Sequence, residues 1–274
     1  MILPFPHRSR GFTLIEVLVA MTLTGIVVAG TLRALSAQKR FYARQARILD
    51  ARHAMRASTI ILASEFREVS AASGDFYFLA SDSVGFRSTV GFGIACAIDA
   101  GNGVLSLSHV SGHFRTEAGD SVLVYVENSR DEGDDSWRAT GVVSISTTGP
   151  SCAQGETARR HVTVSGSVAG VWVGAPVRLF RPYVYALFEM EGRWWLGRRN
   201  RAAAGGYVPV AGPLAPPVDD GLDLVFFDTL TRTPTWDPSI VGRIEINVRA
   251  PTYRSQSDPA YRDMSTSTYL RNNR

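Results

Sequence analysis

The feature that most constrains this chain is an apolar run of 21 residues near its N-terminus, residues 12–32. Glu16 is the only charged residue in the run, which Arg10 and Arg33 bound. As an α-helix rising about 1.5 Å per residue, the run spans about 31 Å, the thickness of a bilayer's hydrocarbon core. Because the residues before it carry positive charge and no acid, we expect a cytoplasmic N-terminus and an extracytoplasmic remainder.

Three interpretations of this run compete: a cleaved secretory signal, a plain membrane anchor and a specialised export signal. A secretory signal has a shorter apolar stretch followed by small residues, and here only residues 28–30 offer a weak cleavage site. A plain anchor leaves Glu16 unexplained, since a carboxylate at the bilayer centre costs about 2.5 to 3.5 kcal/mol. We therefore expect Glu16 to have a partner; the alternative is that its carboxylate snorkels to the interface.

The segment Arg10 to Ala20, RGFTLIEVLVA, resembles the class III signal of type IV prepilins and type II secretion pseudopilins. A basic leader, Gly11, Phe12, a glutamate five residues after the glycine and a long apolar run all occur in register. The resemblance implies that a prepilin peptidase cleaves between Gly11 and Phe12, methylates the Phe12 amine and leaves the apolar segment in place. The leader would then be residues 1–11.

A physical argument supports an assembly role for Glu16 after such a cleavage. The new amine of Phe12 on one helix can pair with the Glu16 carboxylate of a neighbouring subunit, and this pairing relieves two buried charges together. Because the helix must leave lipid for a filament core, we also expect packing through small residues such as Gly25 and Ala29.

Residues 33–72 are predicted to continue the helix beyond the membrane, as an amphipathic segment. Its polar face is basic, with residues Arg33, Lys39, Arg40, Arg44, Arg47, Arg52 and Arg56. A solvated face, or one that packs on acidic partner helices, is favoured over a DNA or lipid surface. Many major pilins have a kinking proline at the position of Arg33, so the resemblance favours a straighter helix and a minor subunit.

Residues 73–274 are predicted to form a β-rich extracytoplasmic head, and the fold class is α+β and pilin-like, with the long helix packed on an antiparallel sheet. The predicted strands are 76–79, 84–89, 103–110, 121–127, 141–147, 161–165, 177–190, 194–196, 222–227 and 243–248, with a proline-rich linker at 213–217. Residues 218–228, Trp236, residues 240–248 and the end at 267–272 resemble the J-type minor pseudopilins and W-type minor pilins.

Motifs for catalysis are absent from the sequence: it contains no G-x-S-x-G, H-E-x-x-H or C-x-x-C, and Lys39 has no glycine nearby to form a phosphate-binding loop. His109 and His113 are expected on the surface, with a turn at residues 111–112. The loop 127–135 is predicted to be a solvated hairpin tip. It contains weak calcium candidates at Asp131, Glu132, Asp134 and Asp135. No cofactor is expected.

Two cysteines, Cys96 and Cys152, are too few for a disulfide framework or a four-cysteine zinc site. In a head expected outside the cytoplasm a disulfide between them is favoured, and it would contribute about 2 to 4 kcal/mol. The alternative is two buried thiols.

These observations predict a non-enzymatic minor pilin or minor pseudopilin, anchored in a bacterial inner membrane, that initiates or caps a filament. The expected partners are a prepilin peptidase and other minor and major subunits; DNA is a less favoured partner. One alternative is a membrane-tethered extracytoplasmic enzyme or binding module. Another is a DNA-binding or adhesive minor pilin. The signal is shared by pilus, secretion and competence systems, so it does not choose among them.

Overall fold

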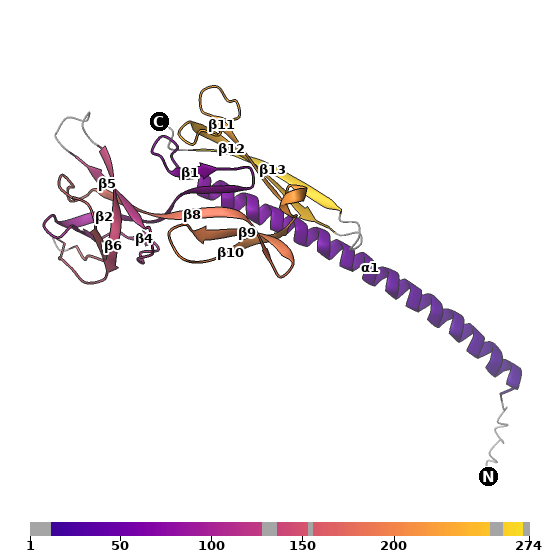
Figure 1. Ribbon diagram of the computed structural model, residues 1–274. Coiled ribbons are helices and arrows are strands. Elements are labelled where there is room, and N and C mark those ends of the chain that lie inside the picture. The colour runs from indigo at the N-terminus through magenta and orange to yellow at the C-terminus, as the bar shows by residue number, and fades with distance from the viewer. Residues whose placement is uncertain (1–11, 128–135, 153–155, 253–259, 271–274) are drawn as a thin grey trace, which may run out of the picture. The chain divides into compact units, whose positions relative to one another are not determined.

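A computed structural model describes residues 12–127, 136–152, 156–252 and 260–270 (Figure 1). The chain divides into two compact units, residues 1–50 and 51–274. One helix, α1 (Leu14–Arg67), passes from the first unit into the second without a break. In the first unit its side chains are exposed, apart from the partly buried Ile48.

In the second unit α1 is amphipathic and supplies one side of a hydrophobic core. Its buried residues recur at spacings of three and four: Ala51, Ala54, Met55, Ser58, Thr59, Leu62, Ala63 and Phe66. The helix ends at Arg67, five residues before the predicted end, because the chain turns at residues 71–74. The Asp75 carboxylate accepts a hydrogen bond from the Ser70 backbone N–H at 2.8 Å and holds this turn.

A five-stranded antiparallel sheet covers this part of the helix, in the order β1-β2-β8-β9-β10. Its strands are β1 (Phe76–Leu79), β2 (Ser83–Asp99), β8 (Pro176–Met190), β9 (Arg193–Asn200) and β10 (Val208–Leu214). A short 3-10 helix, η1 (Pro217–Asp219), leads to a second sheet of β11 (Leu222–Asp228), β12 (Val241–Pro251) and β13 (Tyr261–Tyr269). Phe66 and Phe86 lie at the centre of the core between these elements, with ring centroids 5.4 Å apart.

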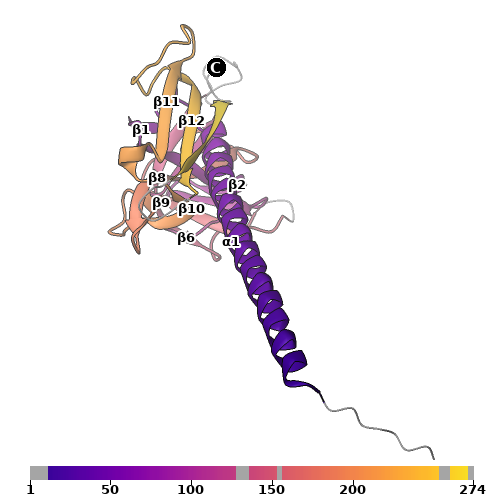
Figure 2. The same cartoon turned by 90° about the vertical axis from the view of Figure 1, so that its right-hand side faces the viewer.

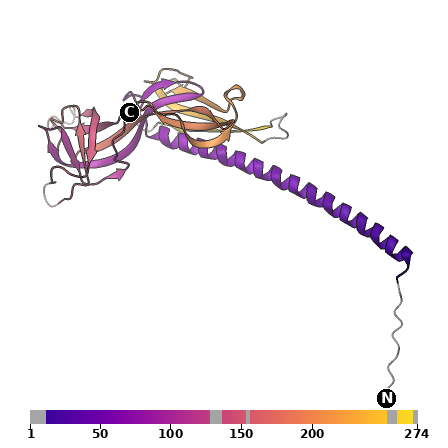
Figure 3. The same cartoon turned by 60° about the horizontal axis from the view of Figure 1, so that its bottom comes forward.

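β2 and β8 extend beyond this core and contribute to a second hydrophobic core. They pair with each other, and β2 also pairs with β3 (Val104–Leu107) and β8 with β5 (Ser121–Val126). β7 (Arg160–Val164) pairs with β3, and β6 (Ser136–Ser146) joins β7 to β5. The order β2-β3-β7-β6-β5-β8, closed by the β2–β8 pairing, is an antiparallel barrel of six strands (Figure 3). Its interior is filled by aliphatic side chains such as Leu105, Val124 and Leu179.

The α+β, pilin-like prediction is confirmed, and each predicted strand overlaps an observed one. The strand predicted at 84–89 is too short: β2 continues to Asp99 through glycines that permit close packing. A Cβ on Gly91 would lie 2.6 Å from the Phe114 ring. Residues 111–112 form β4 (Ser111–Gly112), which pairs with β2, instead of the expected turn. β10 overlaps the expected linker, and β13 was not predicted.

Candidate functional site

The first turn of α1 is closed by a reciprocal pair of hydrogen bonds between Thr13 and Glu16. The Thr13 backbone N–H and hydroxyl donate to Glu16 Oε2 at 3.0 and 2.9 Å. In return, the Glu16 backbone N–H donates to Thr13 Oγ1 at 3.3 Å. This is a capping box, in which a residue before the helix and the third helical residue satisfy each other's backbone donors.

The capping box changes the interpretation of Glu16. The sequence predicts a partner for this carboxylate on another chain, and the structure shows one on its own helix. The T-x-x-E pattern at residues 13–16 was the available signal. Only Oε2 is engaged; among the described residues Oε1 accepts no hydrogen bond. The box therefore fixes the direction of the carboxylate and leaves one oxygen for a further donor.

Phe12, the residue that follows the expected cleavage point, lies one residue before the cap and is 85% exposed. Gly11 lies outside the described residues. Phe12 and Glu16 line one end of a shallow groove along the helix, whose other residues are Val17, Ala20, Met21, Thr24, Gly25 and Val28. Small side chains at Ala20 and Gly25 would let another helix approach closely.

The apolar segment that carries this site is long and hydrophobic enough to cross a membrane. An 18-residue window of α1 has a mean hydropathy of 2.0, and none of its residues is buried by the rest of the protein. Side chains such as Leu14 and Ile26 are 83% and 69% exposed. An apolar surface of this extent requires lipid or protein around it.

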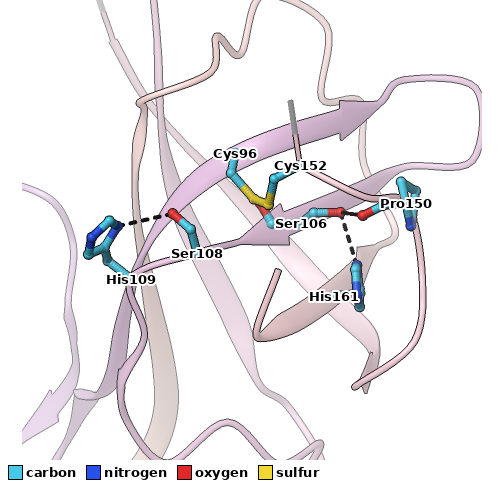
Figure 4. Close-up of a disulfide and its surroundings, with 7 residues drawn as sticks. All are labelled: Cys96, Ser106, Ser108, His109, Pro150, Cys152 and His161. Atoms are coloured by element: carbon cyan, nitrogen blue, oxygen red, sulfur yellow. Dashed lines mark hydrogen bonds between the residues drawn. A yellow bond between two sulfur atoms is a disulfide. The ribbon is translucent and has the colours of Figure 1, made fainter. Parts of the chain in front are cut away.

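Cys96 on β2 and Cys152 are joined by a disulfide, with Cα atoms 5.0 Å apart (Figure 4). Beside it, the Ser106 hydroxyl donates to the Pro150 carbonyl at 2.9 Å. Ser106 Oγ also lies 2.9 Å from Nδ1 of the buried His161. Because Ser106 donates its single hydroxyl proton to the Pro150 carbonyl, its hydrogen bond with His161 must be donated by the Nδ1–H of His161. Burial lowers the pKa of His161.

The remaining candidates do not form a metal site in the part of the chain that the structure describes. His109 pairs with Ser108 and lines one surface depression with Glu156, whereas His113 lines another. Ligand atoms of Glu156 and the two cysteines lie within 4.8 Å of one another, but disulfide sulfurs are not thiolate ligands. The four calcium candidates in the 127–135 loop lie outside the described residues.

A buried ion pair between Arg181 and Asp120 was missed by the sequence analysis. Arg181 Nε and Nη2 donate to the two oxygens of Asp120 at 2.7 and 2.8 Å, and Nη1 reaches Glu117 at 2.8 Å. Nη2 also donates to the Arg115 carbonyl, and Nη1 to the Tyr183 hydroxyl. With its donors satisfied, Arg181 stabilises the structure and is not free to bind a ligand.

Comparison with known proteins gives one match, at the N-terminus. Residues 6–32 match the family model for the prokaryotic N-terminal methylation motif. No curated protein and no solved structure matches the chain. The matched motif supports a type IV pilin or pseudopilin family, whose members are in general structural filament subunits rather than enzymes. It implies processing by a prepilin peptidase, assembly with other pilins and a membrane anchor.

Proposed function

We propose that this protein is a minor pilin or minor pseudopilin that initiates or caps a type IV pilus or a type II secretion pseudopilus. The observation that carries the proposal is the methylation motif on an exposed helix of membrane length, with a capped Glu16 at its start. The motif supplies the processing signal, and the helix supplies the surface that assembly covers.

In this proposal, cleavage before Phe12 creates a charged amine next to a carboxylate whose direction is already fixed. The free Oε1 of Glu16 accepts a hydrogen bond from the Phe12 amine of an adjacent subunit, while Oε2 stays on Thr13. A charge-assisted hydrogen bond in a low-dielectric core is stronger than one between neutral groups. The pairing sets the axial register between neighbouring helices.

The minor role is supported by the head. A six-stranded barrel is built out from the head sheet on β2 and β8, and it has a core of its own. A lobe of this size on every subunit would have to be accommodated at every repeat of a helical filament. On a subunit that occurs once, at a filament end, a lobe of this size is under no such constraint.

Intact-mass and N-terminal peptide analysis of the protein from native membranes tests the proposal. We expect a chain that begins at N-methylated Phe12 and retains the apolar segment. Deleting the gene should abolish piliation, secretion or DNA uptake. A chain that begins at Met1 or after Ala29 would instead support a tethered or secreted protein, and unchanged filament functions after deletion would contradict the assembly role.

A second candidate function, DNA binding by the head, is favoured by one surface of the barrel. Trp137 and Phe92 are 43% and 39% exposed, and Tyr125 packs edge-on against Trp137. The guanidinium of Arg178 lies 5.3 Å from the Trp137 ring centroid. Exposed rings beside arginine suit stacking on single-stranded bases. Retention of the full-length protein on single-stranded DNA should then weaken with salt and with Trp137→Ala, and no retention at low salt would remove this candidate.

A further inference from the structure

The outer edge of β13 is a regular strand edge with no partner among the described strands. β13 pairs with β12 over nine consecutive residues without a register shift, and no described strand follows it in the sheet. In Figure 2, β13 is the outermost strand of this sheet and lies beside α1. Natural proteins usually protect such an edge with a bulge, a proline or charges, because it is a template for another strand.

The hydrogen bonds at both ends of the β12–β13 ladder show which residues point outward. Leu270 N–H donates to the Gly242 carbonyl at 3.0 Å, and Thr252 N–H donates to the Ala260 carbonyl at 2.6 Å. All four residues have even numbers. In an antiparallel ladder the bonded pairs alternate, so even-numbered residues of β13 bond β12 and odd-numbered ones direct N–H and C=O outward.

This outward edge offers no protection along most of its length. Its residues from Asp263 onward are Asp263, Ser265, Ser267 and Tyr269, and all four are exposed. Only Asp263 is charged, and its carboxylate is engaged by Arg249 Nε at 2.6 Å. The last six residues of the strand, 264–269, contain neither charge nor proline. The edge is therefore open to backbone pairing.

The helix beside the edge specifies the chemistry of an added strand. Thr59 contacts Met264 of β13, with Thr59 Oγ1 and Met264 Sδ 3.8 Å apart. At 100° per residue, Arg52 and Arg56 lie about 20° and 60° around the helix from Thr59, and Ile60 about 100°. The carboxylate of Glu65, which is bonded to Ser88 of β2, lies on the opposite side.

An added strand would cover the exposed side of α1 next to β13. This surface, here called the rim, is formed by Arg52, Arg56 and Ile60 and is therefore basic with an apolar margin. Arg52 and Arg56 are exposed and have no acidic partner among the described residues, and Ile60 is 57% exposed. Alternate side chains of an added strand would face this rim. Carboxylates at those positions would complement the two arginines.

We propose that the edge of β13 receives an extended segment of a different filament subunit, with carboxylates on the strand face that meets Arg52 and Arg56. This inference rests on the proposed function in one respect. Subunits inserted in one membrane through the same N-terminal signal share one orientation. Two copies therefore cannot pair edge to edge through a two-fold axis perpendicular to their helices. A head-to-tail contact between identical copies would propagate, whereas a minor subunit needs a contact that is used once. The recognition mode is strand addition.

Site-specific photocrosslinking tests this in cells that make the filament. A photoreactive amino acid replaces Ser267 in the full-length chain, and the crosslinked peptide is identified by mass spectrometry. We expect an adduct with a peptide of another protein that has its own N-terminal methylation motif, with acidic residues at alternate positions. Ser265→Pro, which removes an outward N–H but no bond to β12, should lower the adduct yield about tenfold or more.

Matched variants separate edge pairing from a folding defect. Ser265→Ala keeps the backbone N–H and should leave the yield unchanged. The double substitution Arg52→Glu and Arg56→Glu should lower the yield, whereas Arg193→Glu, a reversal at an exposed arginine of β9, should not. The thermal midpoint of Ser265→Pro should stay within a few degrees of the parent.

The outcomes distinguish this proposal from the proposed function. A chain that is cleaved before Phe12 but gives no adduct, or an adduct only with a second copy of itself, overturns strand addition and leaves the minor-subunit assignment intact. An adduct insensitive to Ser265→Pro and to the arginine reversals also overturns strand addition. A chain that is never cleaved overturns both.

Discussion

Asp120 holds Arg181 through two parallel hydrogen bonds of 2.7 and 2.8 Å, at the point on β8 where the barrel core gives way to the core beside α1. The Asp120 side chain is fully buried and that of Arg181 is 6% exposed. Replacing Asp120 by alanine leaves a buried guanidinium short of acceptors. We expect the free energy of unfolding to fall by about 3 to 5 kcal/mol, measured by denaturant unfolding of the full-length chain in detergent.

A second variant shows whether the pair contributes stability or only avoids an unpaired charge. Replacing both residues with apolar ones, Asp120→Leu with Arg181→Met, should recover much of the loss. If the double variant is as unstable as Asp120→Ala, the geometry of the ion pair itself is required.

Glu16→Gln should separate processing from assembly. The cleavage point between Gly11 and Phe12 is unchanged, and the amide oxygen can still cap Thr13, so N-terminal analysis should show normal cleavage. The charge that would pair with a neighbour's amine is lost, so incorporation into sheared filaments should fall about tenfold or more. Thr13→Val is the matched control: it removes the hydroxyl of the capping box, retains the charge and should lower incorporation less.

Acid should destabilise the barrel through His161. Burial lowers the pKa of His161 from its usual 6.5, so below that pH the unfolded chain binds a proton that the folded chain does not. The stability from the neutral imidazole is present above pH 6.5 and is lost as the pH falls toward the lowered value. The thermal midpoint should drop between pH 7 and 5, and His161→Gln, which can still donate to Ser106, should reduce this drop. An equal drop in both proteins would assign the acid sensitivity elsewhere.

Loss of the disulfide should also lower the stability of the barrel. Cys96→Ser with Cys152→Ser removes a crosslink that closes a loop of 56 residues, and we expect a loss of about 2 to 4 kcal/mol in unfolding free energy. A reducing agent should lower the stability of the parent and leave the double variant unchanged. Sensitivity of the double variant to the reducing agent would mean that the effect does not arise from this bond.

The amino-acid pattern alone was sufficient for the helix, the class of fold and most strands, because these follow local periodicity. The exposed run 12–32 and the buried spacing from Ala51 to Phe66 are both visible in the sequence. The barrel was not predicted, since it depends on β2 and β8 pairing with several strands at once. The continuation of β2 past Thr89 was also not predicted; it contains Gly91 and Gly93, where an added Cβ would meet Phe114 and Leu107.

At the candidate site, too, features made by neighbouring residues can be predicted from the sequence, and features that join distant residues cannot. The cleavage motif and the T-x-x-E cap of residues 13–16 each lie within a few positions, so both are readable from the local sequence. The pairing of Asp120 with Arg181 joins residues 61 positions apart, which no local pattern specifies. The β13 edge also depends on knowing which strand comes last in the sheet.

The shared strands β2 and β8 have a mechanical consequence. They are antiparallel and run through both lobes, with paired residues from Ser83↔Ala186 to Ile94↔Pro176 and one register shift between Thr89 and Gly91. Because both strands cross from one lobe to the other, a pull on the barrel along the strand axis would be carried by two covalent backbones in parallel. The barrel is therefore attached to the helix-bearing lobe by a joint that resists tension without relying on the hydrogen bonds between its two strands.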